Sequence, residues 1–226
     1  MKLNHLSKIF TIIFAFTLSN LVFGVDIPLY PTGPSQDSAF IRFVNGGDTT
    51  ISLTSGGSKA KVNLENNNPS TLFYPVATKS SVTGEFSNGK TTSPISVNVK
   101  PGEFTSVLAL SNSFGLKQII IKEQPSDFNS LKSSLALYNF IPNTCNDAGL
   151  IVINRSITLF ENVKTGTFKR RLLNPVNIDI QLTCDGKPQG NVLKLENLQA
   201  GLRYSVFATP SEKGNRIFFL TDSIAR

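Results

Sequence analysis

The most regular stretch of this chain reads Asn174-Pro-Val-Asn-Ile-Asp-Ile-Gln-Leu-Thr-Cys-Asp-Gly186. Apolar residues occupy every second position from Val176 to Cys184, and polar residues alternate with them. A repeat of two is that of a β-strand, so the pattern predicts an antiparallel strand with one buried and one solvated face. Pro175 lacks an N–H group and suits the first position of a strand. Asp185-Gly186 can take the positive φ angles of a tight hairpin turn.

Shorter runs of the same kind fill the first half of the chain. The segment Ser80–Gly89 is a looser counterpart that also ends in a turn dipeptide, Asn88-Gly89. Further strand-like runs lie at 39–45, 50–54, 60–64, 95–99, 104–110 and 117–122. Short β-branched runs separated by Gly, Asn and Pro are typical of a β-sandwich or barrel. No window shows a sustained helical period, so the chain is predicted to be all-β.

The second half repeats the order of the first. Three pairs of segments correspond, at offsets of 94, 97 and 99: Ile41–Asn45 with Leu135–Asn139, Asn88-Gly89 with Asp185-Gly186, and Pro101–Val107 with Ala200–Val206. We therefore expect two tandem, duplicated antiparallel β-sandwich domains, an N-terminal one at 38–122 and a C-terminal one at 133–226, joined by a linker at 123–132. The alternative is that β-sandwiches share a turn every ten residues or so, which imitates duplication.

The N-terminus has the features of a secretory signal. A basic start is followed by the apolar run Ile9–Phe23 and the small residue Gly24. This order predicts a cleaved signal peptide at 1–24 and export of the rest. The alternative is an uncleaved anchor helix, because the run approaches the roughly 20 residues that span a bilayer. Residues 25–37, rich in proline, predict an extended arm in which Leu29 and Tyr30 form a candidate partner-binding element, unless the arm packs back over its own first domain.

The charge balance is mildly basic. Without Lys2 and Lys8 of the signal, 20 basic residues remain against 15 acidic ones, a net charge of +5. No nucleic-acid-binding signature is present, and such a charge would suit an anionic polysaccharide or an acidic protein face. The one basic cluster consists of Lys164, Lys169, Arg170 and Arg171. It indicates either protection of an edge strand against pairing or a docking patch for a polyuronate or an acidic partner.

The chain has two cysteines, Cys145 and Cys184, both in the second half. In an exported protein they predict one disulfide, within the second domain. The bridge would close a loop of about 40 residues, for which the chain-entropy model gives roughly 4 kcal/mol. Metal binding by these cysteines would require further soft ligands, which the sequence does not offer.

No catalytic residue, metal site or cofactor is predicted. The single histidine, His5, lies in the signal peptide, so imidazole-dependent catalysis is excluded from the exported chain. The acidic residues are scattered rather than paired for glycoside hydrolysis. The chain has no Trp, the usual platform of carbohydrate-binding modules, and its 17 Phe residues alternate as core residues do. Tyr30, Tyr74, Tyr138 and Tyr204 are the other aromatic candidates for a stacking site.

Several stretches together are similar to one family. They are Leu29–Pro34, Ser38–Asn45 and Asn174–Gly186, the last with an Asn-Pro-Val strand that runs into an Asp-Gly turn. These stretches and the layout of signal, Leu-Tyr arm and two β-rich halves resemble the AlgF family of periplasmic accessory proteins for alginate O-acetylation. The two cysteines are not a feature of that family.

The resemblance implies a non-catalytic periplasmic adaptor that is needed for O-acetylation of an exopolysaccharide such as alginate. Its partners would be periplasmic or membrane-associated polysaccharide O-acetyltransferases, which carry the catalytic groups themselves. The alternative function is a periplasmic polysaccharide-binding module that has no enzyme partner.

Overall fold

The computed structural model describes residues 38–112, 115–125, 129–155 and 157–225. These residues form sixteen β-strands, and their only helix is the 3-10 turn Ile153–Arg155. The all-β prediction is confirmed. The predicted signal peptide at 1–24 and the arm at 25–37, with Leu29 and Tyr30, lie outside the described residues.

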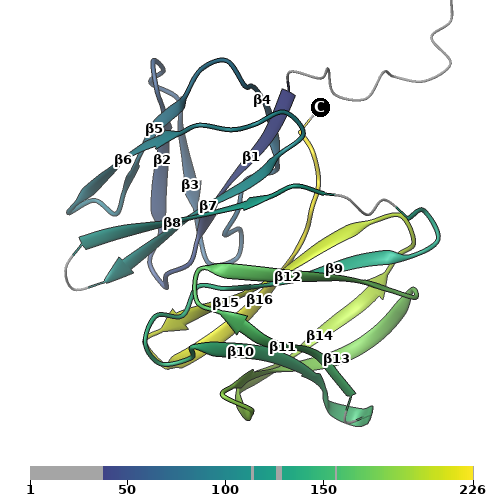
Figure 1. Cartoon of the computed structure of the whole chain (residues 1–226). Helices are drawn as coiled ribbons and strands as arrows, with labels where there is room; N and C mark the ends of the chain where they lie inside the picture. The colour runs from purple at the N-terminus through teal and green to yellow at the C-terminus, as the bar shows by residue number, and fades with distance from the viewer. Residues whose placement is uncertain (1–37, 113–114, 126–128, 156, 226) are drawn as a thin grey trace, which may run out of the picture. The chain divides into compact units, whose positions relative to one another are not determined.

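Two sets of eight strands follow one another along the chain (Figure 1). The first domain consists of β1 (Ser38–Asn45), β2 (Ile51–Ser55), β3 (Lys61–Leu64), β4 (Tyr74–Ala77), β5 (Val82–Ser87), β6 (Thr92–Val97), β7 (Phe104–Asn112) and β8 (Gly115–Glu123). The second consists of β9 (Ser133–Asn139), β10 (Asp147–Val152), β11 (Ile157–Lys164), β12 (Thr167–Leu173), β13 (Val176–Cys184), β14 (Lys187–Leu198), β15 (Arg203–Ser211) and β16 (Gly214–Thr221).

Each domain is a sandwich of two four-stranded sheets. The first has the orders β4-β1-β7-β8 and β3-β2-β5-β6, and the second has the orders β12-β9-β15-β16 and β11-β10-β13-β14. Each strand of the second domain thus takes the place of the strand that precedes it by eight. The prediction of two tandem, similar β-sandwiches is confirmed.

The sequence predicts antiparallel pairing throughout, and this prediction is wrong for one strand pair in each domain. β1 runs parallel to β7, and β9 runs parallel to β15 in the same manner. A parallel pair needs a long crossover between its strands. Here the five strands between β1 and β7 supply it, because four of them form the opposite sheet before the chain returns. Local alternation in the sequence carries no information about such a distant pairing.

The hairpin predicted at Asp185-Gly186 is confirmed. Cys184 pairs with Lys187, so the loop has two residues. Their φ angles are 48° for Asp185 and 78° for Gly186, both in the left-handed region that this turn requires. The strand before the turn, β13, has the predicted bounds and buries the predicted face.

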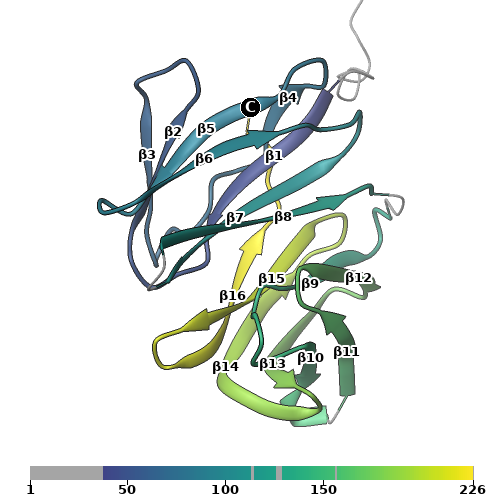
Figure 2. The ribbon, with the colours of Figure 1, turned by 60° about the vertical axis from the view of Figure 1, so that its left-hand side comes forward.

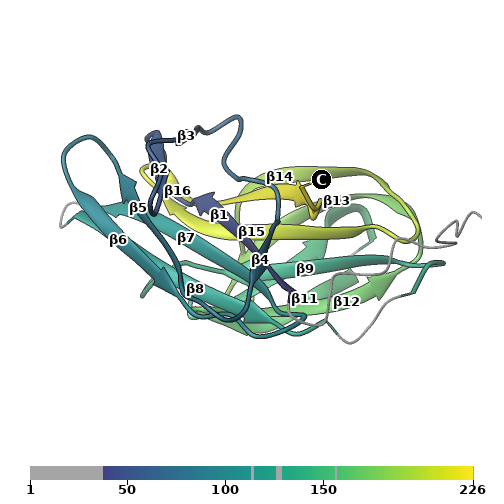
Figure 3. The ribbon, with the colours of Figure 1, turned by 90° about the horizontal axis from the view of Figure 1, so that it is seen from above.

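In the first domain, one strand, β4, was not predicted from the sequence. It contains Pro75, which cannot donate to a sheet and reads as a break in a strand pattern. The structure tolerates Pro75 because β4 is an outer strand of its sheet. Figure 3 shows the loop through which the chain passes from β3 to β4.

A buried asparagine ends the first strand of each domain. Asn45 donates to the carbonyls of Thr49 and Leu64, both at 2.8 Å. Asn139, at the offset of 94, donates to the carbonyls of Cys145 and Val163, both at 2.9 Å. Each side-chain oxygen also accepts from the backbone N–H two residues on. Because both amides satisfy the same backbone groups, Leu64 and Val163 occupy corresponding positions in the two domains.

Three apolar cores hold the described residues together. The first fills the N-terminal sandwich around Ile41, Ile51 and Phe86. The second fills the C-terminal sandwich around Leu137 and Leu150. The third joins the two domains. It contains Val44, Leu108, Leu110 and Ile121 from the first domain, and Ala136, Tyr138, Phe140 and Phe207 from the second.

The predicted disulfide between Cys145 and Cys184 is present, with a Cα–Cα distance of 4.9 Å. It links the segment before β10 to the end of β13, so it lies within the second domain, and both cysteines are buried. Disulfides are characteristic of proteins in oxidising compartments. In the described part of the chain, no helix combines the length and the apolar character needed to cross a bilayer.

Candidate functional site

The predicted basic cluster does not form one surface. Arg170 lies on β12, an outer strand, as the edge-protection interpretation requires. Its side chain is only 6% exposed, however, and its guanidinium group lies among buried carboxylates. Arg170 therefore has to be removed from the predicted docking patch. Alternation on a strand explains the split, since neighbouring side chains point to opposite faces.

The other three basic residues remain at the surface. Lys164 pairs with Asp147 at 2.5 Å, and its side chain is 67% exposed. Lys169 donates to the carbonyl of Glu161, and Arg171 donates to the carbonyl of Leu159, both at 2.8 Å. Binding of an anionic polymer or partner by these three residues stays a prediction.

A buried charge network connects the two domains, and Arg42 of β1 is its first member. Its Nε donates to the Ser106 hydroxyl at 2.8 Å, within the first domain. Its Nη1 and Nη2 reach the second domain, where they donate to Asp222 at 2.6 Å and to Ser205 at 2.9 Å. The guanidinium also lies over the Phe73 ring, 4.4 Å from its centroid. Such a group is both hydrogen-bonded and held by a cation–π contact.

Asp222, just after β16, links Arg42 to a second guanidinium. Its Oδ1 accepts from Arg42 and from the Ser205 hydroxyl, and its Oδ2 accepts from Arg170 at 3.0 Å. The side chains of Arg42 and Asp222 are 2% and 3% exposed. Burial of a carboxylate is tolerated only where such partners replace water.

Glu123, the last residue of β8, is the second buried carboxylate. It receives a two-point interaction from Arg170, at 2.6 and 3.1 Å, and a further contact from Arg203. The Arg203 contact is to Oε1 of Glu123, and the Tyr138 hydroxyl donates to Oε2 at 2.9 Å. All three of these partners belong to the second domain. The sequence predicts Glu123 to lie in a linker, but the residue ends β8 and is part of the joint between the domains.

The pKa values follow from this arrangement. Burial raises the pKa of Tyr138 to about 12, so the phenol stays protonated and remains a donor to Glu123. Burial alone would also raise the pKa of the Asp222 carboxyl. The positive charges of Arg42 and Arg170 outweigh that effect and hold this pKa below its ordinary value. The Asp222 carboxylate therefore stays ionised at neutral pH and well into the acidic range.

Aromatic rings continue the joint on the face of the second domain. Tyr138 stacks against Phe207 at a centroid distance of 4.9 Å and against Phe168 at 5.2 Å, and Phe207 stacks against Phe218 at 5.2 Å. Tyr138 and Phe207 are buried in the core that the domains share. Tyr138 is thus not an open stacking platform, and Tyr204 is likewise buried.

The C-terminal segment crosses from the second domain to the first (Figure 2). Phe73, which precedes β4, donates to the carbonyl of Ser223 at 2.9 Å and accepts from the N–H of Ala225 at 2.8 Å. Ile224 thereby pairs with Phe73 as a single parallel bridge. Backbone pairing adds to the charge network and fixes the C-terminal segment beside β4.

Sequence reasoning missed this joint. One available signal was Arg42, a charge inside the otherwise apolar run Phe40-Ile-Arg-Phe-Val44. Such a residue must find a buried partner or face solvent. Its partner, Asp222, lies 180 residues away along the chain.

The described residues hold no group of acidic, histidine or cysteine side chains suited to a metal ion.

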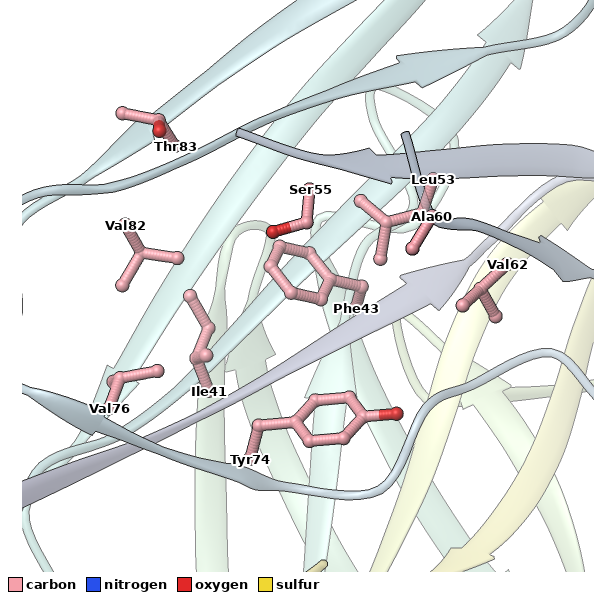
Figure 4. A pocket seen from close by; sticks show the side chains of 10 residues that line it. All are labelled: Ile41, Phe43, Leu53, Ser55, Ala60, Val62, Tyr74, Val76, Val82 and Thr83. Atoms are coloured by element: carbon pink, nitrogen blue, oxygen red, sulfur yellow. The ribbon is translucent and has the colours of Figure 1, made fainter. Parts of the chain in front are cut away.

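The first domain has an apolar groove of about 300 Å³ at the edge formed by β3 and β4. Figure 4 shows Ile41 and Phe43 of β1 at its floor, with Val62 and Tyr74 among the residues around it. Leu53 completes the floor, and Val76 and Val82 border it on the other side. The side chains of Val62 and Tyr74 are 43% and 42% exposed. This groove is the candidate binding site.

No model of a known protein family matches the chain, and no curated protein matches it. Among solved structures, the C-terminal domain of AlgF from P. aeruginosa is 15% identical, with a TM-score of 0.35, over 40% of this chain and 98% of that one. A putative cell adhesion protein from Bacteroides uniformis is 12% identical, with a TM-score of 0.26, over 83% of this chain and 99% of that one. A family 26 carbohydrate-binding module from Eubacterium rectale is 5% identical, with a TM-score of 0.29, over 80% and 96%. These likenesses concern the fold alone.

Proposed function

We propose that the protein is a non-catalytic adaptor for O-acetylation of an exopolysaccharide such as alginate. It acts in the periplasm by binding polysaccharide O-acetyltransferases that are periplasmic or membrane-associated. The observation that carries the proposal is the role of the buried charges. Arg42, Glu123, Arg170 and Asp222 pair across the two domains and so hold them together, which gives a partner protein one connected surface to bind.

Two features of the sequence support the same proposal. The resemblance in the segments 38–45 and 174–186 is to accessory proteins of alginate O-acetylation. The only histidine is His5, so the exported chain would lack the imidazole on which acetyl transfer through serine usually depends. The disulfide of the second domain agrees with an oxidising compartment such as the periplasm.

The experiment is deletion of the gene and measurement of ester-linked acetate in the secreted polymer. We expect acetate to be lost while the amount of polymer is retained, and to return with the intact gene. Complementation of the deletion strain with the Asp222→Asn variant tests whether O-acetylation needs the two domains to be joined. Unchanged acetate in the deletion strain would contradict the proposal.

The second candidate function is polysaccharide binding without an enzyme partner. The observation that favours it is the exposure of Lys164, Lys169 and Arg171 on β11 and β12. Such a module would retain polyuronate by itself, and the retention would fall steeply with salt because charge would dominate it. An adaptor would instead bind an acetyltransferase with an affinity that hardly depends on the polymer. Affinity electrophoresis in gels that contain polyuronate separates the two functions. The variant has Lys164, Lys169 and Arg171 all changed to Ala, and Lys187→Ala is the control.

A further inference from the structure

The two domains differ at one edge of their sandwiches, and the correspondence of their residues shows how. Leu64 corresponds to Val163, because Asn45 and Asn139 bond to their carbonyls. Leu64 pairs with Ile51, and Val163 pairs with Ala148. Further along these strands, three positions of the first domain match three of the second by strand register: Ser55 matches Val152, Val62 matches Phe160, and Gly84 matches Ile180.

At each of these positions the first domain has the smaller side chain. Phe160 is 5% exposed and belongs to the core of the second domain, whereas Val62 is 43% exposed. Val152 and Ile180 are also buried in that core, whereas Ser55 is exposed. The apolar groove of the first domain thus occupies space that the second domain fills with its own side chains. Apolar groups are therefore what would fill the groove of the first domain.

The strands at this edge differ in length as well. β11 and β12 have eight and seven residues, whereas β3 and β4 have four each. In the second domain, Arg171 ties β12 to β11 through the carbonyl of Leu159. The corresponding residue in the first domain is Tyr74, whose ring lies exposed at the rim of the groove. The second domain therefore closes this edge with strand segments that the first domain lacks.

We propose that the groove between β3 and β4 binds an extended segment of a partner protein. The segment lies along β3 as an added strand, because the outer edge of β4 contains Pro75 and is already paired at Phe73 with the C-terminal segment. It places apolar side chains into the groove at alternate positions. Outer strands accept such a strand through backbone hydrogen bonds, while pockets select its alternate side chains. Side chains two residues apart lie about 7 Å apart on one face, which suits a groove with Ile41 and Phe43 at its floor.

Charge at the rim narrows the chemistry of the partner segment. Lys59 and Lys61 are both exposed and stand on either side of Ala60, which lines the groove. Acidic residues beside the apolar positions would complement them and speed association. The inference rests on the proposed adaptor role only for the identity of the partner. The groove and its binding chemistry can be tested without any acetyltransferase.

The test uses fluorescent eight-residue peptides and the purified protein, with binding followed by anisotropy. The library places Leu, Ile or Phe at alternate positions between acidic ends, and a matched library has the same residues with the apolar ones contiguous. We expect only the alternating library to contain binders. Amides of β3 should exchange more slowly when a binder is present.

The decisive variant is Val62→Phe, which places in the groove the residue that the second domain has at that position. We expect peptide affinity to fall by about tenfold or more, because burial of an apolar side chain is lost. The melting temperature should stay the same or rise. Val192→Phe, the same substitution at an exposed position of β14, is the control and should leave binding unchanged. Ser55→Val is a second variant that fills the groove, in case Val62→Phe does not fold.

Several results would overturn the proposal. It fails if no alternating peptide binds, or if Val62→Phe leaves binding intact. Self-association that disappears in Val62→Phe would assign the groove to a second copy of the chain. Binding that arises only after residues 25–37 are removed would assign it to that segment. Each result leaves the acetate measurement on the deletion strain unaffected, so the adaptor role is judged separately.

Discussion

The substitution Asp222→Asn tests the physical account of the joint between the domains. It replaces a buried carboxylate by an amide of nearly the same shape. Arg42 and Arg170 both lose an ion pair with Asp222, at 2.6 and 3.0 Å in the native protein. Both guanidinium groups remain buried, and Glu123 is left to balance the charge of Arg170. The loss of the charge, rather than the loss of packing, dominates the effect.

The expected magnitude follows from burial. Removing one partner of a buried ion pair destabilises a protein by roughly 3–5 kcal/mol, because the other charge is left without compensation. That is a large part of a typical unfolding free energy of about 5–15 kcal/mol. Asp147→Asn is the matched control, since Asp147 pairs with the exposed Lys164. An exposed pair of this kind contributes less than about 1 kcal/mol.

Acid should remove the same contribution from the native protein. The pKa of Asp222 is lowered in the folded state from an ordinary value of 3.8. A lowered pKa means that the stabilisation is fully present above 3.8 and is lost as the pH falls through the lower, folded-state value. The difference in stability between the native protein and Asp222→Asn should therefore be constant at neutral pH and shrink as the pH falls below about 4.

Urea denaturation followed by circular dichroism measures these effects at several pH values. The native protein should unfold in one transition, because the shared core and the network couple the domains. In Asp222→Asn the transition should move to lower urea and separate into two steps. Equal destabilisation by Asp222→Asn and Asp147→Asn would refute this account. A difference that persists unchanged at pH 2 would refute the assignment of the effect to an ionised Asp222.

Three further outcomes are expected. The purified protein should not hydrolyse a chromogenic acetyl ester above the rate of a heat-denatured sample, and turnover that a single internal substitution abolishes would contradict the non-catalytic proposal. Reduction of the bridge between Cys145 and Cys184 should destabilise the second domain by roughly 4 kcal/mol, from its loop length, and free thiols in the alkylated native protein would contradict the bridge. Deletion of residues 26–36 should abolish acetyltransferase binding without changing the melting temperature, whereas a lower melting temperature would favour packing of the arm on its own domain.

Local patterns in the sequence were sufficient for the elements whose causes are local. The alternation in β13 predicted its bounds and its buried face, because side chains of a strand alternate between two faces whatever surrounds them. Asp185-Gly186 predicted a hairpin because few other dipeptides accept two positive φ angles. The repeated Asn45 and Asn139 were visible as an offset of 94, and their identical backbone contacts explain why the segments correspond.

Long-range partners were decided only by the tertiary structure. The parallel pairing of β1 with β7, the burial of Arg170 and the contact between Arg42 and Asp222 each join segments far apart in the chain. From the sequence, Arg170 was grouped with three other basic residues, because a sequence does not show which face of a strand packs against the other domain. The groove likewise became visible only when the register of two sandwiches could be compared. By itself, the sequence determined the all-β class, the turns and the disulfide. Which faces meet, and therefore which charges are buried and which apolar edge stays open, depended on packing between elements that no local pattern specifies.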